Sequence, residues 1–292
     1  MITFEELSDI RAGRPEAIRE ALQSRKRRDL VGNDGRLLII AADHPARGAL
    51  GVGPDPQAMS SRRELLDRLA LALSKPGVDG VLGTPDIIDD LALMGLLDNK
   101  IVVGSMNRGG LLGSKFEYDD RYTAYTISRI VQDGLDCAKS LVRINLKDPA
   151  TVRTLEHCAK AVHMAADAKI PFMLEPFMST WVDGEAHNDL SADAVVLSIS
   201  IAQGLGASSA YTWLKLPVVD GIERVMEATT LPTLLLGGET HGRLDSAFAS
   251  WQSALTIPGV RGLVVGRSLL YPADGNVEQA VDLAAAMVHP HH

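Results

Sequence analysis

The amino-acid sequence predicts an α/β protein, a (β/α)8 TIM barrel with helices that precede its first strand. Eight short apolar runs alternate with helical segments along the 292 residues. Each run is apolar throughout, which is typical of parallel strands that are covered by helices. Eight strands close a barrel of this class, whose usual length is about 250 residues. A doubly wound open sheet is the alternative, but no G-x-G-x-x-G motif follows the first run.

The chain begins with two predicted helices. We expect one domain, residues 1–292, in which residues 1–35 form a helical extension that packs on the bottom of the barrel. Thr3-Phe-Glu-Glu6 has the pattern of a capping box that begins the first helix, and the second is expected from Pro15 to Arg28. The basic run Arg25-Lys-Arg-Arg28 ends this helix, where cations complement the helix dipole, so we expect its side chains to be solvated.

The eight strands are predicted, in chain order, at residues 36–42, 78–82, 101–105, 140–145, 171–176, 209–218, 232–236 and 262–265. Helices are expected between them. Residues 60–74 carry apolar side chains at helical spacing. Thr84-Pro85 and Asp148-Pro149 each combine a capping residue with a proline at the first helical position. Another helix is expected to begin near Ser191, and a last one to run from Val277 to Val288.

The composition predicts a cytoplasmic globular protein. Hydrophobic residues make up 46% and charged residues 23% of the chain, which is enough apolar surface for a large core. No apolar run approaches the roughly 18 residues of a membrane span, and the charged N-terminus does not resemble a signal peptide. A net charge of −8 argues against a nucleic-acid partner. Cys137 and Cys158 have no metal-ligand spacing, so we expect reduced thiols.

Lys215 lies near the C-terminal end of the predicted strand 209–218, which is where barrels of this kind carry their chemistry. Burial disfavours the ammonium form and lowers the pKa of a lysine. A neutral lysine amine attacks a carbonyl to form a Schiff base, so Lys215 is the candidate nucleophile. If it points into the barrel, Trp213 and Tyr211 point there too, because alternate residues of a strand share a face. The alternative is a strand-end lysine whose ammonium reaches water.

Other ionisable side chains end predicted strands. Asp43 and Glu175 are candidate proton-transfer groups, since a carboxylate buried in a barrel mouth is expected to have a raised pKa. The alternative for each is a strand-end ion pair. Lys147 is a rival for the imine, and we interpret it as an auxiliary cation that depresses the pKa of Lys215. Two more candidate substrate-binding residues follow strands, His44 and Arg108.

Glycines follow the seventh and eighth predicted strands, at the usual phosphate site of the barrel. Gly237 and Gly238 would let an anion approach bare backbone N–H groups, and so would Gly266. Arg267 adds a charge-assisted contact to the same anion. The alternative is that these glycines only form tight turns. We favour a phosphate site, because the two turns occur at the two strands where the barrel binds phosphate.

The sequence predicts neither a metal nor a cofactor. The histidines at positions 44, 157, 163, 187 and 241 show no H-x-H or H-E-x-x-H spacing. No G-x-S-x-G nucleophile motif is present either.

Taken in order, these residues resemble the class I aldolase superfamily, in particular the archaeal-type fructose-bisphosphate, the tagatose-bisphosphate and the deoxyribose-phosphate aldolases. The matching motifs are Asp43-His44, Leu174-Glu175-Pro176, Lys215, Gly237-Gly238 and Gly266-Arg267-Ser268. The resemblance extends from about residue 36 to 287. It implies that Lys215 forms the Schiff base and that Glu175 transfers protons. It also implies that Asp43 positions substrate hydroxyls, and that the glycines and Arg267 hold phosphate.

Two positions depart from the fructose-bisphosphate enzymes, which usually have glycine at Pro45 and serine at Leu236. Residues 107–125 are similar to a bacterial aldolase-like branch associated with inositol catabolism. This implies 2-deoxy-5-keto-gluconate 6-phosphate as substrate, cleaved to dihydroxyacetone phosphate and malonic semialdehyde. We therefore predict a class I aldolase, an aldehyde-lyase, that acts on a small phosphorylated carbohydrate, and we expect a homo-oligomer. A phosphosugar isomerase and a non-catalytic sugar-phosphate-binding barrel are the alternatives.

Overall fold

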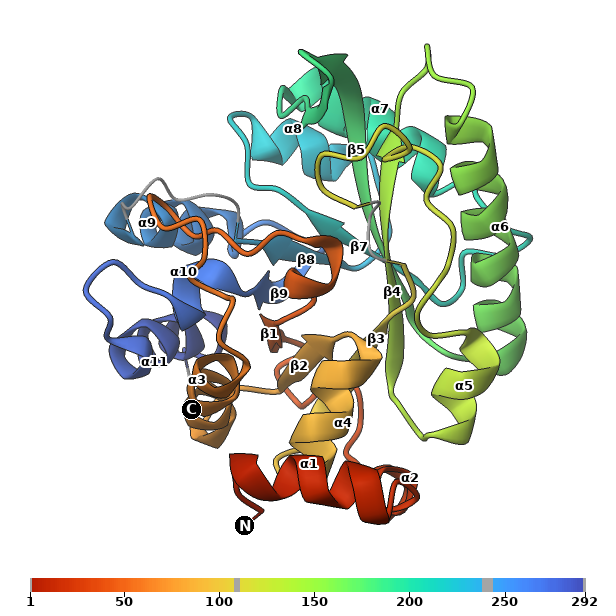
Figure 1. Cartoon of the computed structure of the whole chain (residues 1–292). Coiled ribbons are helices and arrows are strands. Elements are labelled where there is room, and N and C mark those ends of the chain that lie inside the picture. The colour runs from red at the N-terminus through yellow and green to blue at the C-terminus, as the bar shows by residue number, and fades with distance from the viewer. Residues whose placement is uncertain (1, 108–110, 238–243, 291–292) are drawn as a thin grey trace.

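A closed barrel of eight parallel strands forms the centre of the computed structural model, which describes all residues except 1, 108–110, 238–243 and 291–292 (Figure 1). Around the ring the strands follow the order β1, β2, β3, β4, β5, β7, β8 and β9, and β9 pairs with β1. Their bounds are β1 Leu37–Ala41, β2 Gly80–Gly83, β3 Ile101–Ser105, β4 Cys137–Ile144, β5 Phe172–Val182, β7 Thr212–Leu216, β8 Thr233–Leu236 and β9 Val260–Val265. The predicted (β/α)8 barrel is confirmed.

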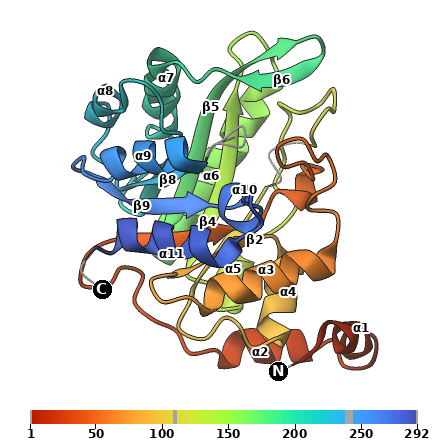
Figure 2. The same ribbon diagram turned by 90° about the vertical axis from the view of Figure 1, so that its left-hand side faces the viewer.

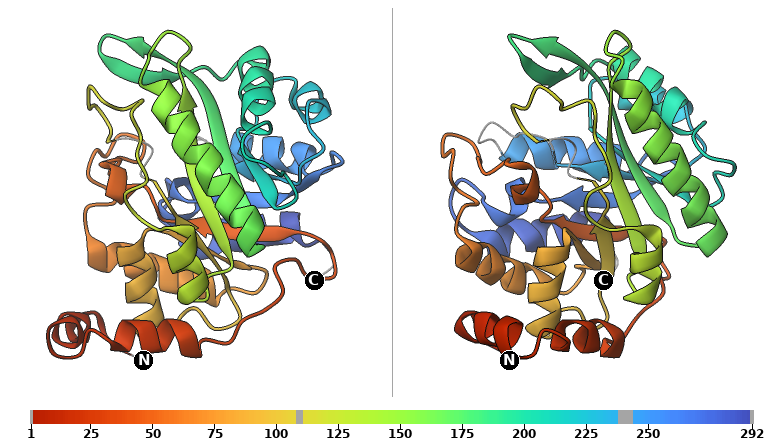
Figure 3. Two further views of the ribbon diagram at one scale, coloured as in Figure 1. Left: turned by 90° about the vertical axis from the view of Figure 1, so that its right-hand side faces the viewer. Right: turned by 45° about the vertical axis from the view of Figure 1, so that its right-hand side comes forward.

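Helices surround the barrel, and α6 covers the outer face of β4 (Figure 3). The helices of the described chain are α1 Phe4–Gly13, α2 Ala17–Ser24, α3 Arg62–Ser74, α4 Pro85–Leu93, α5 Ile127–Gln132, α6 Thr151–Ala168, α7 Ala192–Ala202, α8 Ile222–Glu227, α9 Leu244–Ala254, α10 Arg267–Leu270 and α11 Val277–Val288, with a 3₁₀ turn, η1, at Pro45–Arg47. Within the described ranges, none is long and apolar enough to cross a membrane.

Two apolar cores result from the strict alternation of side chains along each strand. The larger core lies between the strands and the surrounding helices. The smaller core fills the inside of the barrel. It consists of Leu37, Ile39, Ala41, Leu82, Ile101, Val103, Cys137, Met173, Leu234 and Val264, and the half-buried Trp213 packs against it. Inward-facing positions nearer the C-terminal strand ends are therefore left for polar groups.

A β-hairpin extends β5 beyond the barrel, which the sequence did not lead us to expect. β5 continues to Val182 and pairs in antiparallel fashion with β6, Glu185–Asn188 (Figure 2). The turn between them has positive φ at Asp183 and Gly184. Asp-Gly is a common two-residue hairpin turn, so a signal was present. It was obscured because β6 is short, polar and largely exposed.

The prediction for the basic run Arg25–Arg28 is wrong for Arg25 and Arg28, although Lys26 and Arg27 are exposed. α2 ends at Ser24, and the arginines bind carboxylates at the N-terminal ends of the strands. The Nη2 atom of buried Arg25 donates to Asp136 Oδ2 at 2.7 Å, and Arg28 Nη1 donates to Asp79 Oδ1 at 2.7 Å. The same aspartates accept hydrogen bonds from backbone N–H groups of neighbouring strands. The charges thus hold the N-terminal segment to the bottom of the barrel.

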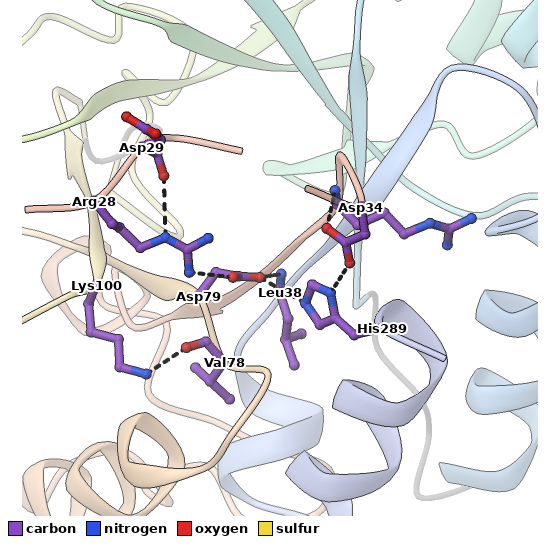
Figure 4. A network of polar contacts seen from close by, with 9 residues as sticks. Arg28, Asp29, Asp34, Leu38, Val78, Asp79, Lys100 and His289 are labelled. Atoms are coloured by element: carbon purple, nitrogen blue, oxygen red, sulfur yellow. Dashed lines mark hydrogen bonds and ion pairs between the residues drawn. The ribbon is translucent and has the colours of Figure 1, made fainter. Parts of the chain in front are cut away.

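His289, just after α11, joins this lower network (Figure 4). Its imidazole contacts Asp34 through Nδ1 and Asp79 through Nε2, the latter at 2.9 Å. Burial by itself would lower the pKa of His289, but its hydrogen bonds to Asp79 and Asp34 outweigh burial and raise that pKa. The ring therefore stays protonated in the folded protein at pH values where it would be neutral in the unfolded chain.

We expect this histidine to make the stability depend on pH. Because its pKa is higher in the folded state, its contribution is complete below the unfolded value of about 6.5 and is lost as pH rises through the folded value. Urea unfolding between pH 6 and 9 should give a free energy of unfolding that falls with pH in the wild type and is flatter in His289→Gln. Equal pH dependence of the two proteins would contradict this role. The exposed His163, replaced in the same way, is the control.

Candidate active site

A cavity of about 950 Å³ opens at the C-terminal ends of the barrel strands. Its floor is formed by the upper inward-facing side chains of the barrel, and its rim by the loops and the β5–β6 hairpin. It contains most of the site residues predicted from the sequence. Those among its lining residues are Asp43, His44, Glu175, Lys215, Gly237, Gly266 and Arg267.

Four buried ionisable side chains form a continuous chain of hydrogen bonds on the floor. Lys215 Nζ donates to Glu175 Oε1 at 2.9 Å. Lys139 Nζ donates to the other oxygen of Glu175, Oε2, at 2.6 Å, and to Asp43 Oδ2 at 2.9 Å. Two carboxylates and two amines thus alternate in the order Asp43, Lys139, Glu175, Lys215.

The strand alternation explains how these groups meet. Met173 belongs to the inner apolar core, and Glu175, two residues further along β5, shares its face. The same relation holds between Cys137 and Lys139 on β4. Trp213 packs on the inner core below Lys215, as predicted. Each polar residue therefore lies directly above an apolar layer that excludes water.

The two lysines have opposite pKa shifts. Burial, aided by the charge of Lys139, lowers the pKa of Lys215, and the opposing effect of Glu175 does not cancel it. Burial also acts on Lys139, but the negative charges of Asp43 and Glu175 outweigh it and raise the pKa of this lysine. Lys139 contacts two carboxylates and Lys215 contacts one. The geometry favours an ammonium at Lys139 and makes Lys215 the more readily deprotonated of the two amines.

The expected raised pKa of Asp43 and Glu175 is wrong. Burial does act in that direction, but Lys139 and Lys215 more than offset it, and the pKa of Glu175 is lowered to about 2. The charge of Lys139 lowers the pKa of Asp43 in the same way. Both groups are therefore carboxylates at neutral pH, held in place by ion pairs.

His44 follows Asp43 and lines the cavity. Burial, together with the nearby charges of Arg47 and Arg267, keeps the pKa of His44 well below its ordinary value despite the charge of Asp43. Its Nδ1 atom is buried and has no hydrogen-bond partner among the described residues. A neutral imidazole at this place can exchange hydrogen bonds with a ligand in the cavity.

The glycines near β8 and β9 are required by close packing. A Cβ atom on Gly266 would lie 2.2 Å from the carbonyl oxygen of Ala41, and one on Gly237 would lie 2.7 Å from Val265 Cγ1. Arg267 lines the cavity beside them. This packing explains both glycines without an anion, so the phosphate site stays a prediction. Two predicted site residues, Gly238 and Arg108, lie outside the described part of the chain.

Lys139 is the site residue that the sequence analysis missed, while Lys147 lies elsewhere. Lys147 is exposed, beyond the end of β4, and is absent from the lining of the cavity. The fourth strand was predicted from residue 140, but β4 begins at Cys137 and includes Lys139. The signal was a lysine within an apolar run, two residues before another inward-facing position, Leu141. The cation expected near Lys215 is therefore Lys139, which lies within β4, and not Lys147.

Among the described residues, no group of three or more His, Cys, Asp or Glu side chains is arranged to hold a metal ion. The ion-paired floor of the cavity instead presents two amines and two carboxylates. Such a set can form an imine and move protons around it.

Several solved structures share this fold. An archaeal fructose 1,6-bisphosphate aldolase superposes with a TM-score of 0.65 at 16% identity, over 94% of this chain and 99% of that one. A Schiff-base-forming fructose-1,6-bisphosphate aldolase, studied through its reaction intermediates, gives a TM-score of 0.64 at 18% identity, over 93% and 99% of the two chains. At these identities the likeness shows the fold alone. No curated protein matches the chain.

A much closer similarity is found with Cgl0159 from Corynebacterium glutamicum. Its crystal structure has a TM-score of 0.97 and 63% identity, over 99% of this chain and 97% of that one. The family model described as Cgl0159-like matches residues 35–285. The chain belongs to the Cgl0159-like family.

Proposed function

We propose that this protein is a class I aldolase that cleaves or forms a C–C bond of a phosphorylated keto sugar or keto acid through a Schiff base on Lys215. The observation that carries the proposal is the buried series Asp43, Lys139, Glu175 and Lys215, joined by contacts of 2.6–2.9 Å, in which the pKa of Lys139 is raised and that of Lys215 is lowered. A neutral, buried amine is what imine formation requires.

The first half of the reaction uses Lys215 as nucleophile. Its nitrogen attacks the ketone carbon to give a carbinolamine, and the former carbonyl oxygen leaves as water when the C=N bond forms. Lys139 and Lys215 contact the two oxygens of the same carboxylate, Glu175, at 2.6 and 2.9 Å. An ammonium on Lys139 therefore lies near the carbonyl that Lys215 would attack and can stabilise negative charge that develops on its oxygen. The protonated imine then acts as the electron sink.

In the second half, a carboxylate removes the proton of the substrate hydroxyl and the adjacent C–C bond breaks. The bonding electrons move into the imine and give a neutral enamine, while the aldehyde departs. Glu175 contacts Lys215 directly, so the positive charge of the protonated imine on that nitrogen lowers the pKa of Glu175, in addition to the larger effect of Lys139. As cleavage cancels this charge, the carboxylate becomes more basic in the step where it takes the proton. Protonation of the enamine and hydrolysis of the imine release the ketone and restore the amine.

The substrate proposal begins from a place for phosphate in the cavity. Arg267 and the backbone near Gly237 and Gly266 offer a place for phosphate at the β8–β9 end of the cavity. Solved aldolases with this fold act on fructose 1,6-bisphosphate, and one contains its catalytic lysine bound to a carbinolamine intermediate. We propose dihydroxyacetone phosphate as the ketone product, and 2-deoxy-5-keto-gluconate 6-phosphate as the first substrate to assay.

Reduction with borohydride in the presence of dihydroxyacetone phosphate tests the mechanism. We expect intact-mass spectrometry to show one covalent adduct per chain, and peptide mapping to assign it to Lys215. An adduct on Lys139 would keep the reaction class and exchange the roles of the two lysines. Binding of the ligand without an adduct would instead favour a phosphosugar isomerase or a non-catalytic sugar-phosphate-binding barrel.

A further inference from the structure

The upper half of β4 extends beyond the end of its neighbour β3. The backbone ladder between the two strands ends at the pair Ser105 and Lys139. On its other edge, β4 stays paired with β5 as far as Ile144. The carbonyl group of Lys139 still accepts a hydrogen bond of 2.9 Å from the N–H group of Met106, but β3 itself has ended at Ser105. The edge of β4 that faces β3 therefore needs other partners from residue 141 on.

The side chain of Asn107 takes the next place in this ladder. Its Oδ1 atom accepts a hydrogen bond of 3.0 Å from the N–H group of Leu141, and its Nδ2 atom donates one of 2.7 Å to the carbonyl oxygen of the same residue. An amide side chain carries the same kinds of donor and acceptor as a peptide group, so it can pair with both backbone groups of a strand residue. Asn107 is 1% exposed, and it continues the pairing of β4 where the backbone of β3 has left.

The same amide binds the loop after β3. Asn107 Nδ2 also donates to Asp120 Oδ2 at 2.7 Å, which uses its second hydrogen atom. This loop is held to α6 by Thr154, whose Oγ1 atom donates to the carbonyl oxygen of Tyr118 at 2.6 Å and accepts from the N–H group of Asp120 at 3.0 Å. Asn107 therefore joins the loop to β4, and Thr154 joins the loop to α6.

The buried ionisable cluster depends on the position of this part of β4. Lys139 lies on the inward face of the strand, two residues before the one that Asn107 binds. Its Nζ atom contacts Glu175 at 2.6 Å and Asp43 at 2.9 Å, so a displacement of β4 by about 1 Å would weaken at least one of these contacts. Ser105 Oγ donates to the backbone carbonyl of Asn107 at 2.8 Å and lies 3.4 Å from Asp43 Oδ2. Both partners of the Lys139–Asp43 ion pair are thus linked to Asn107.

We propose that Asn107 is a positioning residue for the aldolase reaction: its side-chain amide holds β4 in place and thereby keeps the ammonium of Lys139 between the two carboxylates of the cluster. The proposal deepens the proposed aldolase function and rests on it. Asn107 does not line the cavity, so it acts on the chemistry through Lys139. The charge of Lys139 adds to the effect of burial in lowering the pKa of Lys215, and a displaced Lys139 would let that pKa rise.

Hydrogen exchange of dihydroxyacetone phosphate in D2O, followed by NMR, tests this role. A C–H bond at the carbon that bears the hydroxyl group breaks as the imine becomes an enamine, and the enamine takes up a deuteron from solvent, so no aldehyde partner is required. In the wild type, kcat/KM for exchange should rise with pH as the amine of Lys215 becomes neutral.

In Asn107→Ala we expect kcat/KM for exchange to fall about 10- to 100-fold, the scale on which a misplacement of about 1 Å acts. The rising limb of the pH profile should move to higher pH, in the direction expected for Lys139→Met. Asn107→Ser keeps a hydroxyl group and is the milder variant, which serves if Asn107→Ala does not fold. Both changes should be smaller in Asn107→Ser and in the same directions. A limb that stays at the wild-type pH in both variants would overturn the proposal.

Thr154→Val is the matched control. It removes two buried hydrogen bonds of the same loop and leaves the contacts of Asn107 with β4 intact. It should keep the limb at the wild-type pH and a rate within about threefold of the wild type. An equal loss with an equal shift in Thr154→Val would overturn the role of Asn107, because the effect would then come from the loop.

A double-mutant cycle with Lys139→Met shows whether Asn107 acts through that lysine. In the Lys139→Met background, Asn107→Ala should lower the exchange rate by less than about threefold further. The same cycle in urea unfolding at pH 7 needs no activity: the free energy of unfolding lost in Asn107→Ala should be smaller when Lys139 is already replaced. Rate losses that multiply, or stability losses that add, would overturn the proposal.

These measurements separate the proposal from the aldolase function. No hydrogen exchange and no borohydride adduct in the wild type would refute the aldolase, while coupled losses of stability in the cycle would leave the hold of Asn107 on Lys139 standing. An adduct on Lys215, together with an unshifted limb in Asn107→Ala and Asn107→Ser, would do the reverse.

Discussion

Replacing Lys215 with methionine should reduce turnover by about 10⁴-fold or more, which is the scale on which removal of a covalent nucleophile acts. Methionine has a similar volume and an apolar side chain, so it suits the apolar layer around Trp213. Glu175 keeps Lys139 as an ion-pair partner. We therefore expect the free energy of unfolding to change by less than about 2 kcal/mol. The assays are steady-state turnover, the borohydride adduct, and urea unfolding.

Lys147→Met is the control for that experiment. Lys147 was the rival lysine in the sequence, and it is exposed outside the cavity. Its replacement should leave turnover, adduct formation and stability near the wild-type values. If Lys215→Met kept its activity, or still gave an adduct, the imine would have to form on another amine, and Lys139 would be the first candidate.

The barrel was predictable from the sequence because its strands are apolar on both faces. Runs such as Leu37–Ala41 have no polar residue, so helices must cover them, and the number and order of these runs determine the closed ring. The β5–β6 hairpin was not predicted, because β6 is largely exposed and lacks the apolar pattern that marks the barrel strands. A polar strand forms through backbone pairing with its neighbour, and the residue types of a single sequence give little indication of that pairing.

The arginines before β1 show a different limit. A run such as Arg25–Arg28 is solvated in most proteins, and its partners here, Asp79 and Asp136, are 51 or more residues away in the chain. Only the closed ring brings the N-terminal ends of β2 and β4 over this segment. Ion pairs between residues so far apart in the sequence can be predicted only after the fold is known.

In the candidate site, positions were easier to predict than charges. Asp43, Glu175 and Lys215 were identified because they end apolar strands, and the structure brings them together. The direction of the carboxylate pKa shifts was wrong because it depends on Lys139, whose place inside β4 was hidden by an error of three residues in the predicted start of the strand. The inward-facing Lys139 thus outweighs the effect of burial on the pKa values of Asp43 and Glu175.

Replacing Lys139 with methionine should therefore have a larger effect on stability than replacing Lys215. It leaves Asp43 without its closest cation and Glu175 with only Lys215, and the loss of one partner from a buried ion pair costs about 3–5 kcal/mol. In the wild type both carboxylates have lowered pKa values, so their stabilisation is present above the unfolded value of about 4 and is lost as pH falls. The difference in the free energy of unfolding between the wild type and Lys139→Met should have its full size at pH 7 and should become smaller below about pH 4.5. Urea unfolding at pH 7 and pH 4 measures it.

The same variant should alter the pH dependence of catalysis in a defined direction. The amine of Lys215 must be neutral to attack, so kcat/KM rises as pH increases through its pKa. The charge of Lys139 helps burial to lower that pKa, while Glu175 and Asp43 raise it. Without Lys139 the two carboxylates act unopposed, and the rising limb of the profile should move to higher pH. Lys139→Arg keeps the charge and should keep the limb closer to its wild-type position. A limb that stayed in place in Lys139→Met, or moved to lower pH, would mean that burial alone keeps Lys215 neutral.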